Sequence, residues 1–322
     1  MLVVAIVKNE RQTIHECVSN LLLQKSNCKF LFSDNHSSDG TFEYLKIVSE
    51  SSSGFEVIQP EKEIPLPRHF KFLLDYAESH YPEVPYRILI GGDDSYVGTE
   101  LLASLVETCE FQRNFNSSPV IALPALKLYN VSNPEKSRTL SNLMLLNSRS
   151  KVLRTLGLAI APTEFGYYNF VLGLMRTEDF NFWGRSWLES LNESDFELHS
   201  RRNIESEYFA SYKLILRNRV KIVSTQTMLK RQHNRSNDGT RINETESPNE
   251  PRVTEEKTRL TIVKHQFRHS SHLIRSVWRY RSKFRVDALM LGILGGLIAT
   301  LSNMLYFFYV KGRDLMRHVP HK

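Results

Sequence analysis

Two short polar clusters in this 322-residue sequence combine residue types that could carry chemistry. One is GGDDS at 91–95, in which Asp93 and Asp94 are adjacent. Adjacent carboxylates suit a hard divalent cation, because Mg²⁺ and Mn²⁺ prefer oxygen ligands and keep water or phosphate oxygens as the others. The two glycines would let a bulky ligand approach the backbone. The alternative is a turn whose aspartates only cap a following helix.

The second cluster is DNHSSDGT at 34–41. Asp34 and Asn35 would present a carboxylate and an amide to the edge of a nucleotide base. Asp39 would tighten the turn and cap the next helix, and this structural role stays open beside a role in binding.

The apolar pattern places both clusters at the ends of buried strands. Strands are predicted at 2–7, 30–32, 55–58, 87–90 and 119–123, and helical spacing separates most of them. Alternating strands and helices imply right-handed crossovers and a mostly parallel sheet. Ligands of such sheets bind at the carboxyl ends of the strands. We therefore expect a binding site where 34–41 and 91–95 meet.

The charge of the chain is unevenly distributed. Residues 252–322 hold 14 Lys and Arg against 4 Asp and Glu, although the whole chain has a net charge of +7. The body, 1–251, is slightly acidic, which argues against nucleic acid as a partner and favours an anionic membrane surface for the tail. The three cysteines form no metal-binding spacing, and we expect reduced thiols in a cytosolic compartment.

The C-terminal region predicts attachment to a membrane. Residues 288–310 carry no charge and could span a hydrocarbon core of roughly 30 Å. Basic residues on both flanks leave the orientation ambiguous, whereas the absence of an export signal places the body in the cytosol. Residues 252–285 predict a basic amphipathic interfacial helix, or alternatively a solvated helix that packs on the body. Small residues every four positions from Ala288 to Thr300 could seat a second helix, giving a homodimer, or could face lipid.

Together with Val7-Lys8-Asn9-Glu10 after the first strand, the two clusters resemble the family 2 glycosyltransferases in order and in spacings of about 25 and about 55 residues. The resemblance covers 1–125 well and is thin beyond. It implies a GT-A fold, an α/β Rossmann-like mixed sheet flanked by helices. It also implies a metal-dependent, hexosyltransferase-type reaction that moves a sugar from a UDP-, GDP- or dTDP-sugar to a hydroxyl with inversion.

The resemblance assigns roles to individual residues. Asp94, with Asp93 beside it, would hold Mg²⁺ or Mn²⁺ and offset the charge of the departing diphosphate. His233 would be a third metal ligand or a solvated loop residue, Arg231 would clasp the diphosphate, and Arg68 would face the donor. The positions that match the nucleoside-binding residues of the family are Val7, Glu10, Asp34 and Asp39.

The base that takes the acceptor proton is less clear, because the family usually shows Glu-Asp at the start of a late helix and this sequence does not. We favour Glu207, with Glu205 and Asp195 as alternatives. Each of these carboxylates, taken singly, could also be an ordinary solvated helix residue.

We therefore expect a transferase domain at 1–251, with a nucleotide-sugar half (1–125) and an acceptor half (126–251). A membrane-interface segment (252–285) and a transmembrane helix with a basic tail (286–322) would tether it to the cytosolic face of a membrane, the bacterial inner membrane being the expected one. The acceptor would be a glycan or a lipid-linked saccharide, as in polysaccharide biosynthesis. The rival hypothesis is a non-catalytic membrane-tethered scaffold that kept the fold. A nucleotidyltransferase is disfavoured, because the loop after the first strand lacks glycine.

Overall fold

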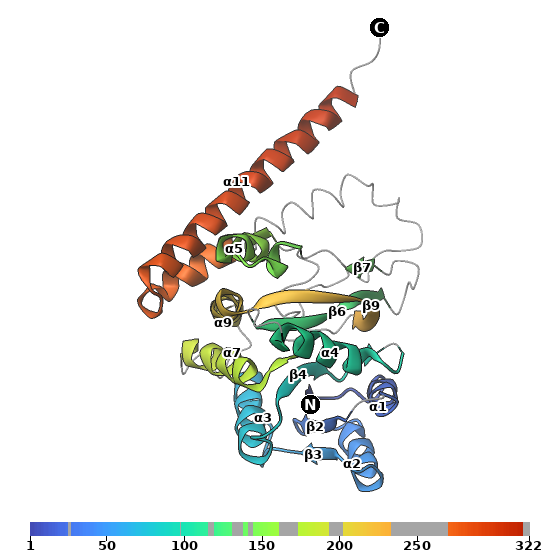
Figure 1. Cartoon of the computed structure of the whole chain (residues 1–322). Helices are drawn as coiled ribbons and strands as arrows, with labels where there is room; N and C mark the ends of the chain where they lie inside the picture. Colours follow the sequence, from blue (N-terminus) through green and yellow to red (C-terminus); the bar gives the residue numbers. More distant parts are fainter. Residues whose placement is uncertain are drawn as a thin grey trace.

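The computed structural model describes residues 1–24, 27–96, 98–114, 119–130, 138–140, 144–160, 173–192, 202–232 and 270–317. The first of its two sheets has the strand order β3-β2-β1-β4-β8. Its strands are β1 (Leu2–Val7), β2 (Lys29–Asp34), β3 (Phe55–Ile58), β4 (Tyr86–Gly91) and β8 (Met175–Arg176). The first four are parallel, and β8 is antiparallel to β4. This is the mixed sheet that the sequence predicts (Figure 1).

The strands at the centre of this sheet are buried on both faces. Leu2, Val3, Val4, Ala5 and Val7 of β1 are each at most 1% exposed. A parallel strand covered on both sides reads as a continuous apolar run, which is why the sequence pattern locates β1. The helices that follow the first three strands are α1 (Ile14–Leu22), α2 (Thr41–Ser51) and α3 (Leu66–His80).

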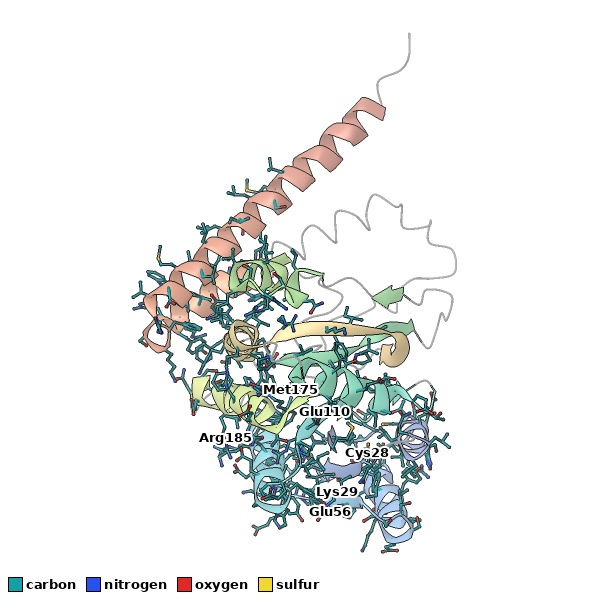
Figure 2. The ribbon with its side chains drawn as sticks, in the orientation of Figure 1. Cys28, Lys29, Glu56, Glu110, Met175 and Arg185 are labelled. Carbon is teal, nitrogen blue, oxygen red and sulfur yellow. The ribbon has the colours of Figure 1, made fainter. Side chains whose placement is uncertain are left out.

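A second sheet has the order β5-β9-β6-β7. Its strands are β5 (Asp94–Tyr96), β6 (Val120–Asn130), β7 (Arg138–Leu140) and β9 (Arg219–Gln232). The strand predicted at 119–123 therefore lies in this second sheet and is longer than expected. β8 links the sheets, because Leu174 and Ala122 exchange backbone hydrogen bonds of 2.8 and 2.9 Å while Met175 pairs with Arg87. Figure 2 shows Met175 in the middle of the molecule.

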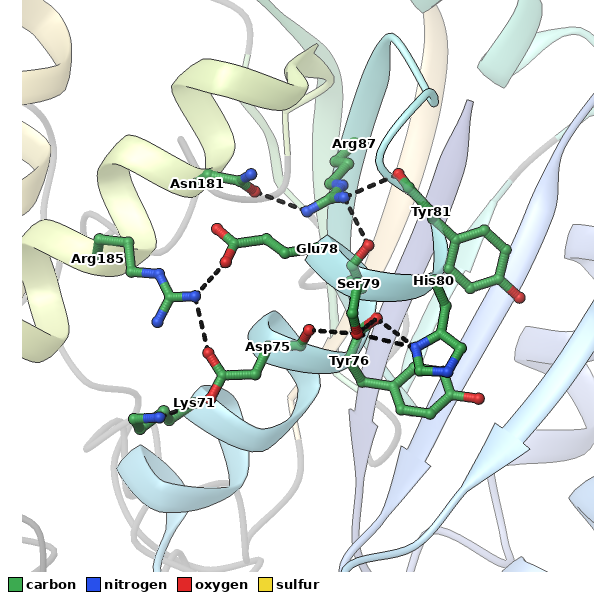
Figure 3. A network of polar contacts seen from close by, with 11 residues as sticks. Lys71, Asp75, Tyr76, Glu78, Ser79, His80, Tyr81, Arg87, Asn181 and Arg185 are labelled. Carbon is green, nitrogen blue, oxygen red and sulfur yellow. Dashed lines mark hydrogen bonds and ion pairs between the residues drawn. The ribbon is translucent and has the colours of Figure 1, made fainter.

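The remaining helices cover the sheets. They are α4 (Leu101–Asn114), the 3₁₀ turn η2 (Met144–Asn147), α5 (Lys151–Ile160), α7 (Thr177–Ser190) and α9 (Arg202–Arg217). The polar network of Figure 3 fastens α7 to α3, with Arg185 forming ion pairs with Asp75 and Glu78. Fully buried Arg87 donates hydrogen bonds to Asn181 Oδ1 and to the carbonyls of Ala77 and Tyr81. The last two bonds provide donors for backbone carbonyls at the C-terminal end of α3.

The C-terminal part begins with a helix at 270–279 and continues through η4 (Arg281–Lys283) to α11 (Val286–Arg317). Where the predicted amphipathic helix is described, its Leu273 and Val277 are fully buried in the core of the body, and an interfacial role for the segment stays a prediction. Residues 252–269 lie outside the described residues.

The small residues of α11 seat other helices of the same chain. A Cβ at Gly292 would lie 2.8 Å from a methyl of Val277, and one at Gly296 would lie 2.4 Å from Ile274. On the α5 side, a Cβ at Gly295 would lie 2.8 Å from Thr155. Gly292 and Gly296 of the predicted small-residue stripe thus seat another helix of the same chain, and a homodimer through this stripe stays a prediction. Close approach at these positions requires glycine.

Within the described residues, no helix is both long and apolar enough to cross a membrane. The transmembrane helix predicted at 286–322 is therefore not confirmed.

Candidate active site

The loop after β1 and the loop after β2 are held together by hydrogen bonds. The Asn9 N–H donates to Ser37 Oγ (2.8 Å), and the Ser38 N–H donates to Asn9 Oδ1 (2.9 Å). Asn9 has φ of +56°, a left-handed conformation that asparagine tolerates better than most residues. Because the bonds cross between the loops in both directions, the position of each loop depends on the other.

Asp39 adds a further, charge-assisted link between these loops. Its Oδ2 accepts the N–H of Arg11 (2.9 Å), and its Oδ1 accepts the N–H (3.0 Å) and hydroxyl (2.6 Å) of Thr41. Burial by itself would raise the pKa of Asp39, but the bonds from Thr41 and Arg11 together outweigh it and lower that pKa. Thr41 begins α2, so Asp39 has at least the capping role that the sequence suggests.

Asp34 and Asn35 anchor a further loop at the end of β2. Asp34 is fully buried and accepts hydrogen bonds from the N–H and hydroxyl of Ser37 and from Gln59 Nε2 (3.0 Å). The Asn35 amide donates to the Ile64 carbonyl (2.7 Å) and accepts the Ile64 N–H (3.0 Å). The segment from 59 to 64 is therefore fixed beside the two residues expected to meet a nucleotide base.

Gly92 of GGDDS has a structural role in addition to the predicted approach of a ligand, which stays a prediction. A Cβ at Gly92 would lie 2.8 Å from Val7 Cγ1 and 3.0 Å from Glu10 Cγ. Gly92 is thus needed for the approach of the β1–α1 loop, whatever a ligand requires. The neighbouring Gly91 N–H donates to Asp94 Oδ2 (2.7 Å), and Asp94 is only 2% exposed.

Negative charge gathers where the three loops meet. Burial, followed by the charge of Asp93, raises the pKa of Glu10 to about 7. The charge of Asp39 acts in the same direction, and a hydrogen bond from Thr13 opposes it. Residues separated by up to 83 positions in sequence are therefore electrostatic neighbours. A cation bound here would relieve this repulsion.

Metal ligands were expected at Asp93, Asp94 and His233. Among the residues that the structure describes, no group of three or more His, Cys, Asp and Glu side chains could hold a metal ion, and His233 is outside them. Two carboxylates still fit a Mg²⁺ ion, which proteins commonly hold through one or two carboxylates while substrate phosphates supply other ligands. Asp93 is half-buried and Asp94 is bonded to the backbone, so Asp93 is the more accessible of the pair.

The two candidate bases on α9 have different surroundings. Glu205 forms an ion pair with Arg279 (2.7 Å), and its carbonyl accepts the hydroxyl of Ser276 (2.8 Å). Glu207 is 5% exposed. Two positions along an α-helix correspond to a rotation of about 200°, so Glu207 points to nearly the opposite side. The third candidate, Asp195, lies outside the described residues.

Arg68 and Arg231 were the two arginines predicted to face the donor, and the structure describes the side chain of the first and only the backbone of the second. Arg68 lies in the first turn of α3 and is exposed. Arg231 lies near the end of β9, where its backbone pairs with Tyr129. β5 pairs with β9 so that Asp94 is opposite Lys230. The second sheet thus brings the backbone of Arg231 next to the GGDDS loop, a proximity that nothing in the sequence indicates.

Sequence reasoning missed Gln59, whose side-chain amide donates a hydrogen bond to the buried carboxylate of Asp34. Its position directly after β3 was a usable signal, since the carboxyl ends of neighbouring parallel strands share one edge. His69 is also fully buried, and its Nε2 lies 2.7 Å from Ser33 Oγ, beside Asp34. Burial lowers the pKa of His69 to about 4, so the ring is neutral near pH 7.

Comparisons with known proteins agree with this arrangement. The family model described as glycosyl transferase family 2 matches residues 2–165. A search of curated proteins found no similar sequence. The solved structure of S. aureus TarS 1–349 in complex with UDP-GlcNAc is 14% identical, with a TM-score of 0.51 over 94% of this chain and 72% of that chain. The mannosyltransferase PcManGT from Pyrobaculum calidifontis, in complex with GDP-Man and Mn²⁺, is 11% identical, with a TM-score of 0.47 over 99% of this chain and 81% of that one.

At such low identity, the likeness to TarS speaks for the fold alone, and it agrees with the predicted GT-A arrangement of a Rossmann-like mixed sheet between helices. The family match covers the strands and loops that carry Glu10, Asp34, Asp39, Asp93 and Asp94. Since that match extends over half of the sequence, this chain belongs to glycosyl transferase family 2.

Proposed function

We propose that this protein transfers a sugar from a nucleotide-diphosphate sugar to an acceptor hydroxyl, in one inverting displacement assisted by Mg²⁺ or Mn²⁺. The observation that carries the proposal is the convergence of the loops after β1, β2 and β4, in which Gly92 lies against Val7 and the charges of Asp93 and Asp39 act on Glu10. Membership of the family supports the glycosyltransferase class.

The nucleoside of the donor would lie over the ends of β1 and β2. Asp34 and Asn35 are fixed there by Ser37, Gln59 and Ile64, so little side-chain entropy remains to be lost on binding. The donor diphosphate would extend toward the GGDDS loop. Arg231 is the candidate cation for it, because its backbone lies beside that loop.

Asp93 and Asp94 would hold the metal ion, with Asp93 as the more accessible ligand. When bound, the ion supplies Lewis-acid stabilisation of the negative charge on the leaving diphosphate. The fixed loops supply orientation, because the backbone bonds of Asp39 and Asp94 keep both strand ends rigid.

Glu207 would accept the proton of the attacking hydroxyl. Of the two described carboxylates on α9, Glu205 faces Arg279 of the C-terminal part, and Glu207 is 5% exposed on nearly the opposite side of the helix. We propose a glycan or lipid-linked saccharide as the acceptor.

Donor binding is the first test. The full-length chain is mixed with UDP-, GDP- and dTDP-sugars, each with Mn²⁺ and with EDTA, and the unfolding temperature is measured. At least one donor should raise it in a metal-dependent way, because a ligand of the native state stabilises that state. If no donor changes the unfolding temperature, the proposal is wrong.

Release of nucleoside diphosphate is the second test, made with the donor that binds and with glycan and lipid-linked acceptors. Release that requires both metal and acceptor supports the transferase. Tight donor binding without release on any acceptor would favour the non-catalytic scaffold instead.

A further inference from the structure

Helix α11 has two unlike faces. Its inner face packs on the body through Gly292, Gly295, Gly296 and the fully buried Ala299. The other face carries large apolar side chains at helical spacing, each between 48% and 75% exposed. We call this set the outer stripe: Val286, Met290, Leu294, Leu297, Leu301 and Leu305.

The packing of α11 against the other residues that the structure describes does not explain the outer stripe. The glycine face already seats the helix at 270–279 and α5. Beyond α5, α11 extends away from the two sheets (Figure 1). A contiguous row of exposed Leu and Met is uncommon on a soluble surface and marks a site of interaction.

Basic and aromatic residues stand at the start of the stripe. Arg281 and Arg285 in the connection between the helices are exposed, and the guanidinium of Arg281 lies 5.2 Å from the ring centroid of Trp278. Trp278 is itself 58% exposed. Tryptophan and arginine beside an apolar surface are the side chains that favour the headgroup region of a bilayer.

Charge distinguishes a lipid surface from a second copy of the chain. The sequence is basic at both ends of the stripe, with three cations against one carboxylate at 281–287 and three against one at 311–317. Two copies that pair through the stripe would bring like charges together whether their helices ran parallel or antiparallel. Anionic headgroups would complement both ends at once.

We propose that the outer stripe docks α11 on the surface of an anionic lipid bilayer, with the turn at 280–285 among the headgroups. This inference stands on exposed side chains and charge, so it does not depend on the glycosyl-transfer proposal. Its test uses no sugar donor.

The experiment is flotation of the full-length protein with vesicles of phosphatidylcholine alone and of phosphatidylcholine with phosphatidylglycerol. The wild-type protein should float with the mixed vesicles and less with the neutral ones. The double variant Leu294→Ser with Leu301→Ser should bind the mixed vesicles at least about tenfold more weakly, because it removes two apolar side chains from the interface. Arg281→Glu with Arg285→Glu should weaken binding and reduce its dependence on salt.

Matched controls separate these effects from general loss of surface apolarity or charge. Leu23→Ser with Ile47→Ser removes side chains that are 61% and 65% exposed, at the C-terminal cap of α1 and on α2. Lys46→Glu with Lys62→Glu makes the same charge change on α2 and in the loop before α3. Both should bind vesicles like the wild type. Unfolding temperatures of all variants check the fold.

Three results would overturn the proposal. The wild-type protein could fail to float with either vesicle. The stripe variant could float as well as the wild type. Light scattering without lipid could also show a dimer that the stripe substitutions dissociate while vesicle binding is unchanged, in which case a second copy covers the stripe.

Discussion

The strand-end loops and helix α9 both supply candidate carboxylates, but they hold them in different ways. In the loops, Asp34, Asp39 and Asp94 accept backbone N–H groups, so each side chain also builds the site. On α9, the two carboxylates point to different sides because of the helix geometry. Glu205 forms an ion pair with Arg279, and Glu207 is buried. Substitutions of these three aspartates should therefore affect both binding and stability, whereas substitutions on α9 should affect them separately.

The largest effect is expected from Asp93→Asn. Loss of the more accessible metal ligand should lower metal-dependent transfer by about a hundredfold to a thousandfold, since charge on the leaving group is then poorly offset. Initial rates against Mn²⁺ concentration measure it, and the unfolding temperature should hardly change. Near-normal rates at saturating Mn²⁺ would remove Asp93 from the metal site.

Asp94→Ala is the matched loop variant. It should lower metal-dependent turnover to a similar extent, and in addition it leaves the Gly91 N–H without its acceptor, which costs about 1–3 kcal/mol of unfolding free energy. Urea denaturation measures this cost. Equal stability of the two variants would contradict the dual role of Asp94.

Glu207→Gln should keep donor binding yet lower transfer by about a hundredfold or more, the usual contribution of a general base. Glu205→Gln is its control on the same helix and should transfer at close to the normal rate, with at most about 1 kcal/mol lost from the exposed pair with Arg279. Single-turnover rates at saturating donor separate the two. Reversed results would move the base to Glu205.

Asp39→Asn should weaken the link between the β1–α1 and β2–α2 loops. The substitution replaces charge-assisted bonds from Arg11 and Thr41 by neutral ones, so we expect a loss of about 1 kcal/mol in stability and a several-fold weaker donor affinity. Denaturation and donor titration by fluorescence measure both. Weaker affinity with unchanged stability would instead indicate that Asp39 contacts the donor directly.

The last prediction concerns Glu10, whose pKa is raised to about 7, mainly by burial and then by Asp93. An acid with a raised pKa in the folded state holds its proton while the unfolded chain loses it, so stability falls as pH rises from about 4.5 to about 7. Glu10→Gln should remove this contribution. The unfolding temperature of the variant, relative to that of the wild type, should therefore increase as pH rises from about 4.5 to about 7. Parallel pH profiles for the two proteins would rule out the shift.

The expected architecture and the location of the site came from local patterns. Buried parallel strands read as apolar runs, and the polar clusters at 34–41 and 91–95 stand directly after two of them. Strand direction then places both clusters at one edge of the sheet, because parallel strands end on the same side. These features depend on residues within a few positions of each other, so the sequence alone predicts them.

Other features depend on packing between distant segments. Gly92 meets Val7 and Glu10 only because β4 lies beside β1, and Asp94 faces Lys230 only because β5 joins a second sheet. The same holds for α11, whose glycines contact Val277, Ile274 and Thr155 and so leave the outer stripe exposed. The sequence determined which residue types stand at strand ends and along helices. Only the tertiary structure decided which of them are neighbours. Those contacts join segments that are far apart along the chain, and no local pattern encodes which segments meet.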